Sequence, residues 1–104
     1  MTTPAYVYAA RLLRVVDADT FVIDLDLGLR VHAHATIRLR GIDTPERSTD
    51  AGRSAAAFVT ARLTGEPLIV QTYKDQQSFA RWIADVWVGG IHVAELLRAA
   101  GHEA

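Results

Sequence analysis

Hydrophobic and polar positions alternate along much of the chain up to Arg40. In Asp19–Leu27 every second side chain is apolar, and Arg30–Arg40 repeats this pattern after Gly28. A period of two is typical of strands that bury one face. Tyr6–Val16 is also rich in β-forming residues, although its alternation is interrupted. We therefore predict a meander of three strands, with a hairpin turn at Gly28. The inward-facing residues of its second and third strands are predicted to be Phe21, Ile23, Leu25, Leu27, Val31, Ala33, Ala35, Ile37 and Leu39.

Residues 48–64 change to a helical period. Ser48, Thr49 or Asp50 can cap the start of this helix, and Gly65 suits the position just after its end. The apolar stripe that would face the core consists of Ala55, Phe58, Val59 and Leu63.

Two further strands and a short helix follow. The strands are predicted at Pro67–Lys74 and Arg81–Val88, with a turn at Gly89-Gly90 and a helix over Val93–Ala100. This order favours an α+β fold that is mainly β: a five-stranded Greek-key barrel of the OB type. One helix follows the third strand, and the short one ends the chain. Other α+β arrangements fit the pattern nearly as well. We expect one domain over residues 1–104.

Composition restricts the classes of protein. The chain has no cysteine, so it can form neither a disulfide framework nor a thiolate metal site. A net charge of −1 argues against a protein that coats nucleic acid nonspecifically, but it allows an enzyme with a locally charged site. No apolar run is long enough for a membrane span, and no signal pattern is evident. We expect a cytoplasmic protein without a membrane partner; secretion after removal of a leader is not excluded.

The most unusual chemistry lies in Thr36–Glu46. Arg38 and Arg40 share the polar face of the predicted third strand, and Asp43, Thr44 and Glu46 follow directly. Arginine suits phosphate, and carboxylate and carbonyl oxygens suit a hard divalent cation such as calcium. The segment Asp17-Ala18-Asp19-Thr20 can add carboxylates from the end of another strand, although aspartate is also a common turn former. Arg40 alone is better explained as a residue of a solvated strand face.

Four segments together resemble the staphylococcal nuclease (thermonuclease) family. They are Val-Asp-Ala-Asp-Thr at 16–20, Arg-Leu-Arg-Gly-Ile-Asp-Thr-Pro-Glu at 38–46, Ala-Ala-Phe at 56–58 and Phe-Ala-Arg at 79–81. The resemblance implies an OB-fold barrel and a calcium-dependent phosphodiesterase that acts on DNA and RNA.

The resemblance also implies roles for particular residues. Asp19 and Asp43 match the carboxylate ligands of calcium, and the backbone carbonyl of Thr44 matches a third ligand. Glu46 matches the general base. Arg38 and Arg81 match the two arginines that bind the scissile phosphate. Asp17 is similar to an acidic neighbour of the metal.

The chain also departs from the family pattern. Ala18 replaces a common glycine, so its φ should stay negative. Phe79 stands where a tyrosine hydroxyl could hold a nucleotide phosphate. The third helix of the family is missing from this sequence, so we expect self-association through the surface that it would cover.

Two alternatives remain open. The first is an inactive OB-fold module that binds nucleic acid or protein without cutting. The second is a structural cluster in which Arg38 and Arg40 pair with Asp43 and Glu46.

Overall fold

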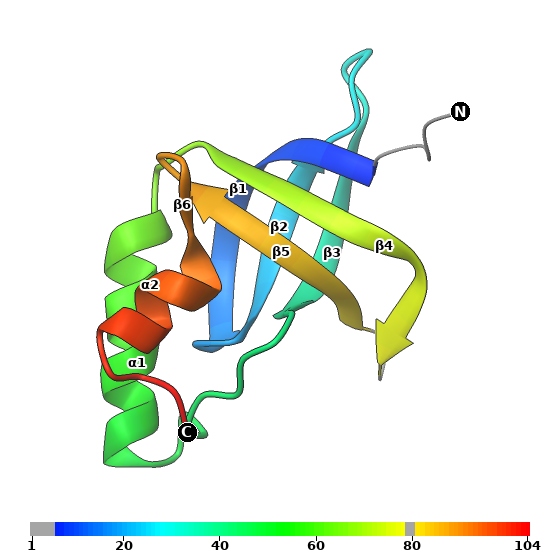
Figure 1. Cartoon of the computed structure of the whole chain (residues 1–104). Helices are drawn as coiled ribbons and strands as arrows, with labels where there is room; N and C mark the ends of the chain where they lie inside the picture. Colours follow the sequence, from blue (N-terminus) through cyan, green and yellow to red (C-terminus); the bar gives the residue numbers. More distant parts are fainter. Residues whose placement is uncertain (1–5, 79–80) are drawn as a thin grey trace.

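A computed structural model describes residues 6–78 and 81–104 of the chain (Figure 1). Neither helix in this part is long and apolar enough to cross a membrane. The elements, in chain order, are β1 (Tyr6–Asp17), β2 (Thr20–Asp26), β3 (His32–Leu39), α1 (Asp50–Leu63), β4 (Leu68–Ser78), β5 (Arg81–Val88), β6 (Ile91–His92) and α2 (Val93–Ala99).

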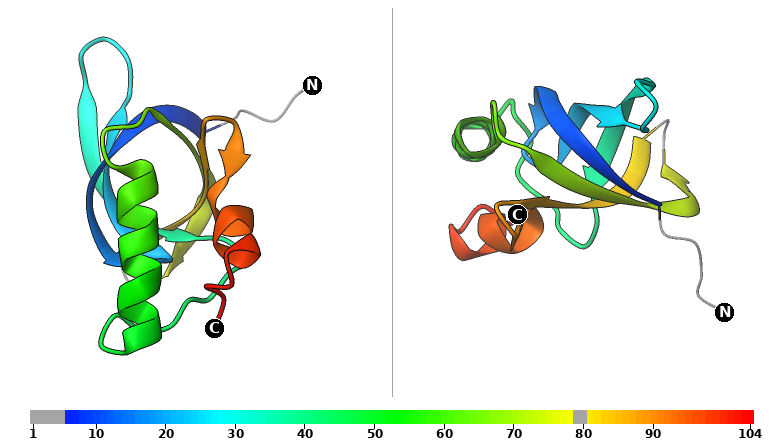
Figure 2. Two further views of the ribbon diagram at one scale, coloured as in Figure 1. Left: turned by 90° about the vertical axis from the view of Figure 1, so that its left-hand side faces the viewer. Right: turned by 90° about the horizontal axis from the view of Figure 1, so that it is seen from above.

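The strands form a closed barrel. The sheet runs in the order β3-β2-β1-β4-β5-β6, and an additional parallel pairing between β3 and β5 closes it. All other pairings are antiparallel. Both helices lie on the same side of the barrel (Figure 2). The predicted mainly β fold, with five main strands, a helix after the third and a short C-terminal helix, is confirmed.

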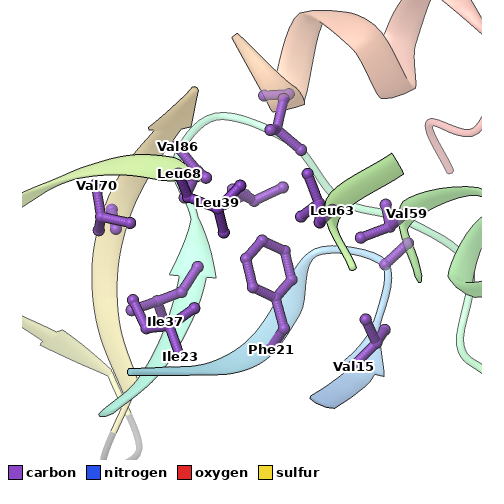
Figure 3. Close-up of a cluster of buried hydrophobic side chains, with 14 of the residues drawn as sticks. Val15, Phe21, Ile23, Ile37, Leu39, Val59, Leu63, Leu68, Val70 and Val86 are labelled. Atoms are coloured by element: carbon purple, nitrogen blue, oxygen red, sulfur yellow. The ribbon is translucent and has the colours of Figure 1, made fainter. Parts of the chain in front are cut away.

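The barrel interior holds the hydrophobic core. Phe21 lies at its centre, between Ile37 and Leu39 of β3 and the side chains of α1 (Figure 3). The predicted helix stripe is confirmed at Ala55, Val59 and Leu63, which are buried, whereas Phe58 is only half-buried. Side chains at alternate strand positions fill the interior because successive residues of a strand point to opposite faces.

The hairpin between β2 and β3 differs from the prediction. Leu27 and Val31, predicted to face the core, are 43% and 52% exposed. The alternation continues to the hairpin tip, but the hairpin projects beyond the rest of the sheet (Figure 1), so no opposite strand covers these side chains. Leu29 and Arg30 at the tip have positive φ angles, and β3 therefore begins at His32 rather than Arg30. The two-residue strand β6 was not predicted.

Candidate active site

A tight hairpin turn places Asp19. Asp17 pairs with Thr20 across it, which leaves Ala18 and Asp19 as the turn residues. Ala18 is buried and its φ is not positive, so alanine is tolerated where a glycine was expected. The backbone N–H of Leu39 donates to the carbonyl of Asp19 at 2.8 Å. This bond fixes the turn beside the end of β3.

Arg38 connects the turn to the loop after β3. Its Nη1 donates to the carbonyls of Leu39 and Ile42, each at 2.9 Å. Its Nη2 donates to Asp43 Oδ1 and lies 3.7 Å from Asp19 Oδ2. Since one guanidinium reaches both carboxylates, two acidic residues far apart in sequence are brought to one place.

Asp19, Asp43 and Thr44 together present oxygen atoms at this place. Asp19 is buried, and its Oδ2 accepts from the backbone N–H of Thr44 at 3.0 Å. The side chain of Asp43, in contrast, is 79% exposed. The Thr44 hydroxyl is buried and lacks a hydrogen-bond partner among the described residues. An unsatisfied buried oxygen beside two carboxylates suits a hard cation.

The carboxylates alone would not complete a metal site. No group of three histidine, cysteine, aspartate or glutamate side chains in the described ranges could hold a metal ion. Calcium takes about six to eight oxygen ligands, including backbone carbonyls and water. The oxygen donors present therefore fit calcium, provided that the Thr44 carbonyl and water supply part of its ligand set.

The backbone of Glu46 is held by the start of α1. Its carbonyl accepts from the N–H of Thr49 at 3.0 Å and from the Thr49 hydroxyl at 2.7 Å. Thr49 is also the N-cap of α1, because its hydroxyl accepts from the N–H of Gly52 at 3.0 Å. The Glu46 side chain is exposed and has no hydrogen-bond or ion-pair partner in the described part of the chain.

Arg47 ties the same loop to the first strand. Its N–H donates to Asp17 Oδ1 at 2.9 Å, and its Nη1 donates to the carbonyl of Val15 at 2.8 Å. Asp17 thus holds the loop and lies two residues before Asp19 in the chain. Sequence reasoning missed Arg47 and Gly52 because neither belongs to the recognised motifs. Their roles depend on contacts that only the folded chain makes, with β1 for Arg47 and with the backbone of Glu46 for Gly52.

Arg81 lies on the same face of the barrel as Arg38. The parallel pairing of β3 and β5 joins Arg38 to Ile83. Side chains alternate along a strand, so Arg81, two residues before Ile83, shares its outward face. Arg81 is half-buried as the first residue of β5. Phe79, at which a lost hydroxyl contact was predicted, lies outside the described residues.

Arg40 does not join the cluster proposed for it from the sequence. Its Nη1 donates to the Tyr73 hydroxyl at 3.2 Å and lies 3.6 Å from Asp85. Of the predicted structural cluster, the pair Arg38–Asp43 is present, but Arg40 points to β4 and β5. No local sequence pattern indicates this contact, because Tyr73 lies on β4 and Asp85 on β5, both far from Arg40 along the chain.

A closed OB-type barrel with arginines and carboxylates at the end of β3 defines the class of this protein. The model of the family described as staphylococcal nuclease homologues matches residues 36–102. The chain therefore belongs to the staphylococcal nuclease family, as its motifs indicated.

Two curated proteins are similar to the chain. Over 65 residues it is 34% identical to the probable staphylococcal-like nuclease CAN1 of Oryza sativa subsp. japonica. The aligned region covers 62% of this chain and 19% of that protein. Over 86 residues it is 29% identical to the thermonuclease of Staphylococcus hyicus, covering 76% and 48% of the two chains. The chain thus spans less than half the length of each of these relatives.

Proposed function

We propose that this protein is a calcium-dependent nuclease that hydrolyses phosphodiester bonds of DNA and RNA. Membership of a family of nucleases supports the reaction class. The observation that carries the proposal is the position of Arg38, whose Nη2 contacts both Asp19 and Asp43. An arginine that can bind phosphate, next to two carboxylates that can bind a divalent cation, suits metal-assisted phosphodiester hydrolysis.

Each proposed residue has a distinct task. Arg38 and Arg81, on one face of the barrel, would donate hydrogen bonds to the phosphoryl oxygens and stabilise the charge that develops there. Glu46, exposed on a loop held by Thr49, would take the proton from the attacking water, a role typically worth about 10²–10⁴-fold. Calcium, held by Asp19, Asp43 and the Thr44 carbonyl, would supply further positive charge at the phosphate.

Nuclease assays with matched variants test this proposal. Purified protein is incubated with single-stranded DNA and with RNA, in calcium and in chelator. We expect degradation only in calcium, and its loss in Glu46→Gln. Glu66→Gln is the control, since Glu66 is an exposed glutamate on the loop after α1. Equal degradation by Glu46→Gln and the control would remove Glu46 from the mechanism.

One observation favours a second candidate, a module that binds nucleic acid without cutting it. Arg38 already donates to the carbonyls of Leu39 and Ile42 and to Asp43, so these contacts would compete with a phosphate. In that case the protein would retain labelled DNA or RNA without shortening it, whether or not calcium is present.

A further inference from the structure

Asp85 is a buried carboxylate on the outward face of β5. Its side chain is only 12% exposed. It points away from the barrel interior, because its neighbour Ala84 belongs to the core and successive residues of a strand face opposite sides. Three side chains surround it: the Tyr73 hydroxyl donates to Oδ2, His92 Nε2 lies 2.8 Å from Oδ1, and Arg40 Nη1 lies 3.6 Å from Oδ2. Burying a carboxylate is unfavourable unless it is paired and hydrogen-bonded, and here both conditions are met.

This network fixes the guanidinium of Arg40. Nη1 is held by Tyr73 and Asp85, and the guanidinium carbon lies 4.8 Å from the centroid of the Tyr73 ring. Yet the side chain is 57% exposed, and within the described residues its Nε and Nη2 have no hydrogen-bond partner. The hydrogen bond with Tyr73 is the main cause that raises the pKa of Arg40, a residue type that is charged at neutral pH in any case. Arg40 is thus immobilised at one end and open to a ligand at the other.

Arg40 borders the same hollow as Arg38. This hollow has a volume of about 350 Å³, and Arg38, Arg40, Gly41, Ile42, Asp43 and Ile83 are among the residues that line it. Arg38 lies in β3, and Arg40 directly follows the last residue of that strand, Leu39. Two residues of extended chain span at most roughly 6.6–6.8 Å. Glu103 also borders the hollow, but its carboxylate faces Arg98, with 3.2 Å between Nε and Oε1.

We propose that Arg40 binds the phosphate of the nucleotide next to the one held by Arg38. This inference rests on the proposed nuclease function, and it extends the substrate from one phosphate to two. Tyr73 and Asp85 act as positioning residues that hold Arg40 with its unpaired donors toward the hollow. A planar guanidinium with two adjacent donors suits bidentate binding of a phosphate.

Equilibrium binding in chelator tests the proposal without cleavage. Fluorescein-labelled tetrathymidylate is titrated with protein at several salt concentrations and followed by anisotropy; thymidine 5′-monophosphate serves as a competitor. For Arg40→Gln we expect roughly tenfold weaker binding of tetrathymidylate, the loss typical of a charged hydrogen bond. The slope of log K against log salt should fall by about 0.7, the value for one single-strand phosphate contact. The inhibition constant of the monophosphate should not change.

The control is Arg62→Gln. Arg62 is also an exposed arginine stacked on an aromatic ring, with its guanidinium carbon 4.9 Å from the centroid of Phe58, but it lies on α1 and does not border the hollow. Arg62→Gln changes the net charge by the same amount as Arg40→Gln. Identical slopes and affinities in the two variants would overturn the proposal, as would a failure of the unaltered protein to bind tetrathymidylate.

Two further variants separate binding from folding. Arg40→Lys keeps the charge but loses the bidentate fork, so the salt slope should persist while tetrathymidylate binds more weakly. Tyr73→Phe keeps the ring but removes the hydroxyl contact with Nη1 of Arg40. It should likewise weaken the binding of tetrathymidylate and leave the salt slope unchanged. A purely structural role would lower the melting temperature and leave these binding values unchanged. Cleavage is assayed separately, so failure of the nuclease proposal is distinguishable from failure of the Arg40 proposal.

Discussion

The carbonyl oxygen of Glu46 lies 1.7 Å from the point that a Cβ atom on Gly52 would occupy. The carbonyl of Pro45 is also close, at 2.8 Å from the same point. Any side chain at position 52 would therefore displace the loop that carries Glu46. A glycine inside a helix normally costs about 1 kcal/mol relative to alanine. Here it allows the loop to pack directly on the first turn of α1.

Gly52→Ala should therefore lower both stability and activity. We expect a loss of about 1–3 kcal/mol in the free energy of unfolding, as for other overpacked sites. Nuclease activity should fall by up to about 100-fold, because small displacements of a reacting group are costly. Chemical denaturation measures the change in the free energy of unfolding, and the rate of nucleic-acid degradation measures the change in activity.

The control for Gly52→Ala is Ala57→Gly, at an exposed position of the same helix. It should cost about 1 kcal/mol from helix propensity alone, with activity intact. A more stable Gly52→Ala protein would contradict the close approach of Glu46.

Calcium should raise the melting temperature through Asp19 and Asp43. A ligand that binds only the folded protein adds about 2.7 kcal/mol of stability at 100 times its dissociation constant. We expect Asp19→Asn and Asp43→Asn each to abolish this effect in thermal unfolding experiments.

In chelator the two variants should differ. Asp43 is exposed, so Asp43→Asn should unfold close to the temperature of the unaltered protein. Asp19→Asn should be less stable, because buried Asp19 accepts from the N–H of Thr44. Full calcium stabilisation in either variant would remove that residue from the metal site.

The network around Asp85 should make stability depend on pH at the acid end. Burial by itself raises the pKa of Asp85, but hydrogen bonds from Tyr73 and His92 and the charges of His92 and Arg40 outweigh it, and the pKa is lowered from 3.8. A lowered pKa means that the folded protein holds the proton less tightly than the unfolded chain does. The stabilisation is therefore present above the usual pKa and is lost as pH falls through the folded value.

Asp85→Asn should accordingly destabilise the protein by about 1–3 kcal/mol near neutral pH, the usual cost of a lost buried charged hydrogen bond. The difference from the unaltered protein should shrink when urea unfolding is repeated below the usual aspartate pKa. Asp50→Asn is the control, since Asp50 is almost fully exposed and pairs only with Arg53 in the described part of the chain. A difference for Asp85→Asn that does not vary with pH would contradict the lowered pKa.

Much of the fold could be read from local patterns. A helix cap at Ser48, Thr49 or Asp50, Gly65 after the helix end and most of the buried stripe of α1 follow from rules that act within one or two turns, and the structure assigns the cap to Thr49. The same local rule failed at Leu27 and Val31, because alternation predicts which side chains share a face but not whether anything covers that face. Self-association and the cellular location stay predictions.

The sequence by itself determined the family, the strand pattern and the residue types of the loop after β3, because each of these can be recognised from a contiguous segment of sequence. Only the tertiary structure decided which side chains meet. Arg38 reaches Asp19 because the turn that carries Asp19 lies beside β3. The loop that carries Glu46 packs against α1 because Gly52 has no side chain. Arg40 contacts Tyr73, which is 33 residues away in the sequence. The physical reason is that barrel closure brings distant strands together, and the pairing register that aligns them is a property of the whole sheet.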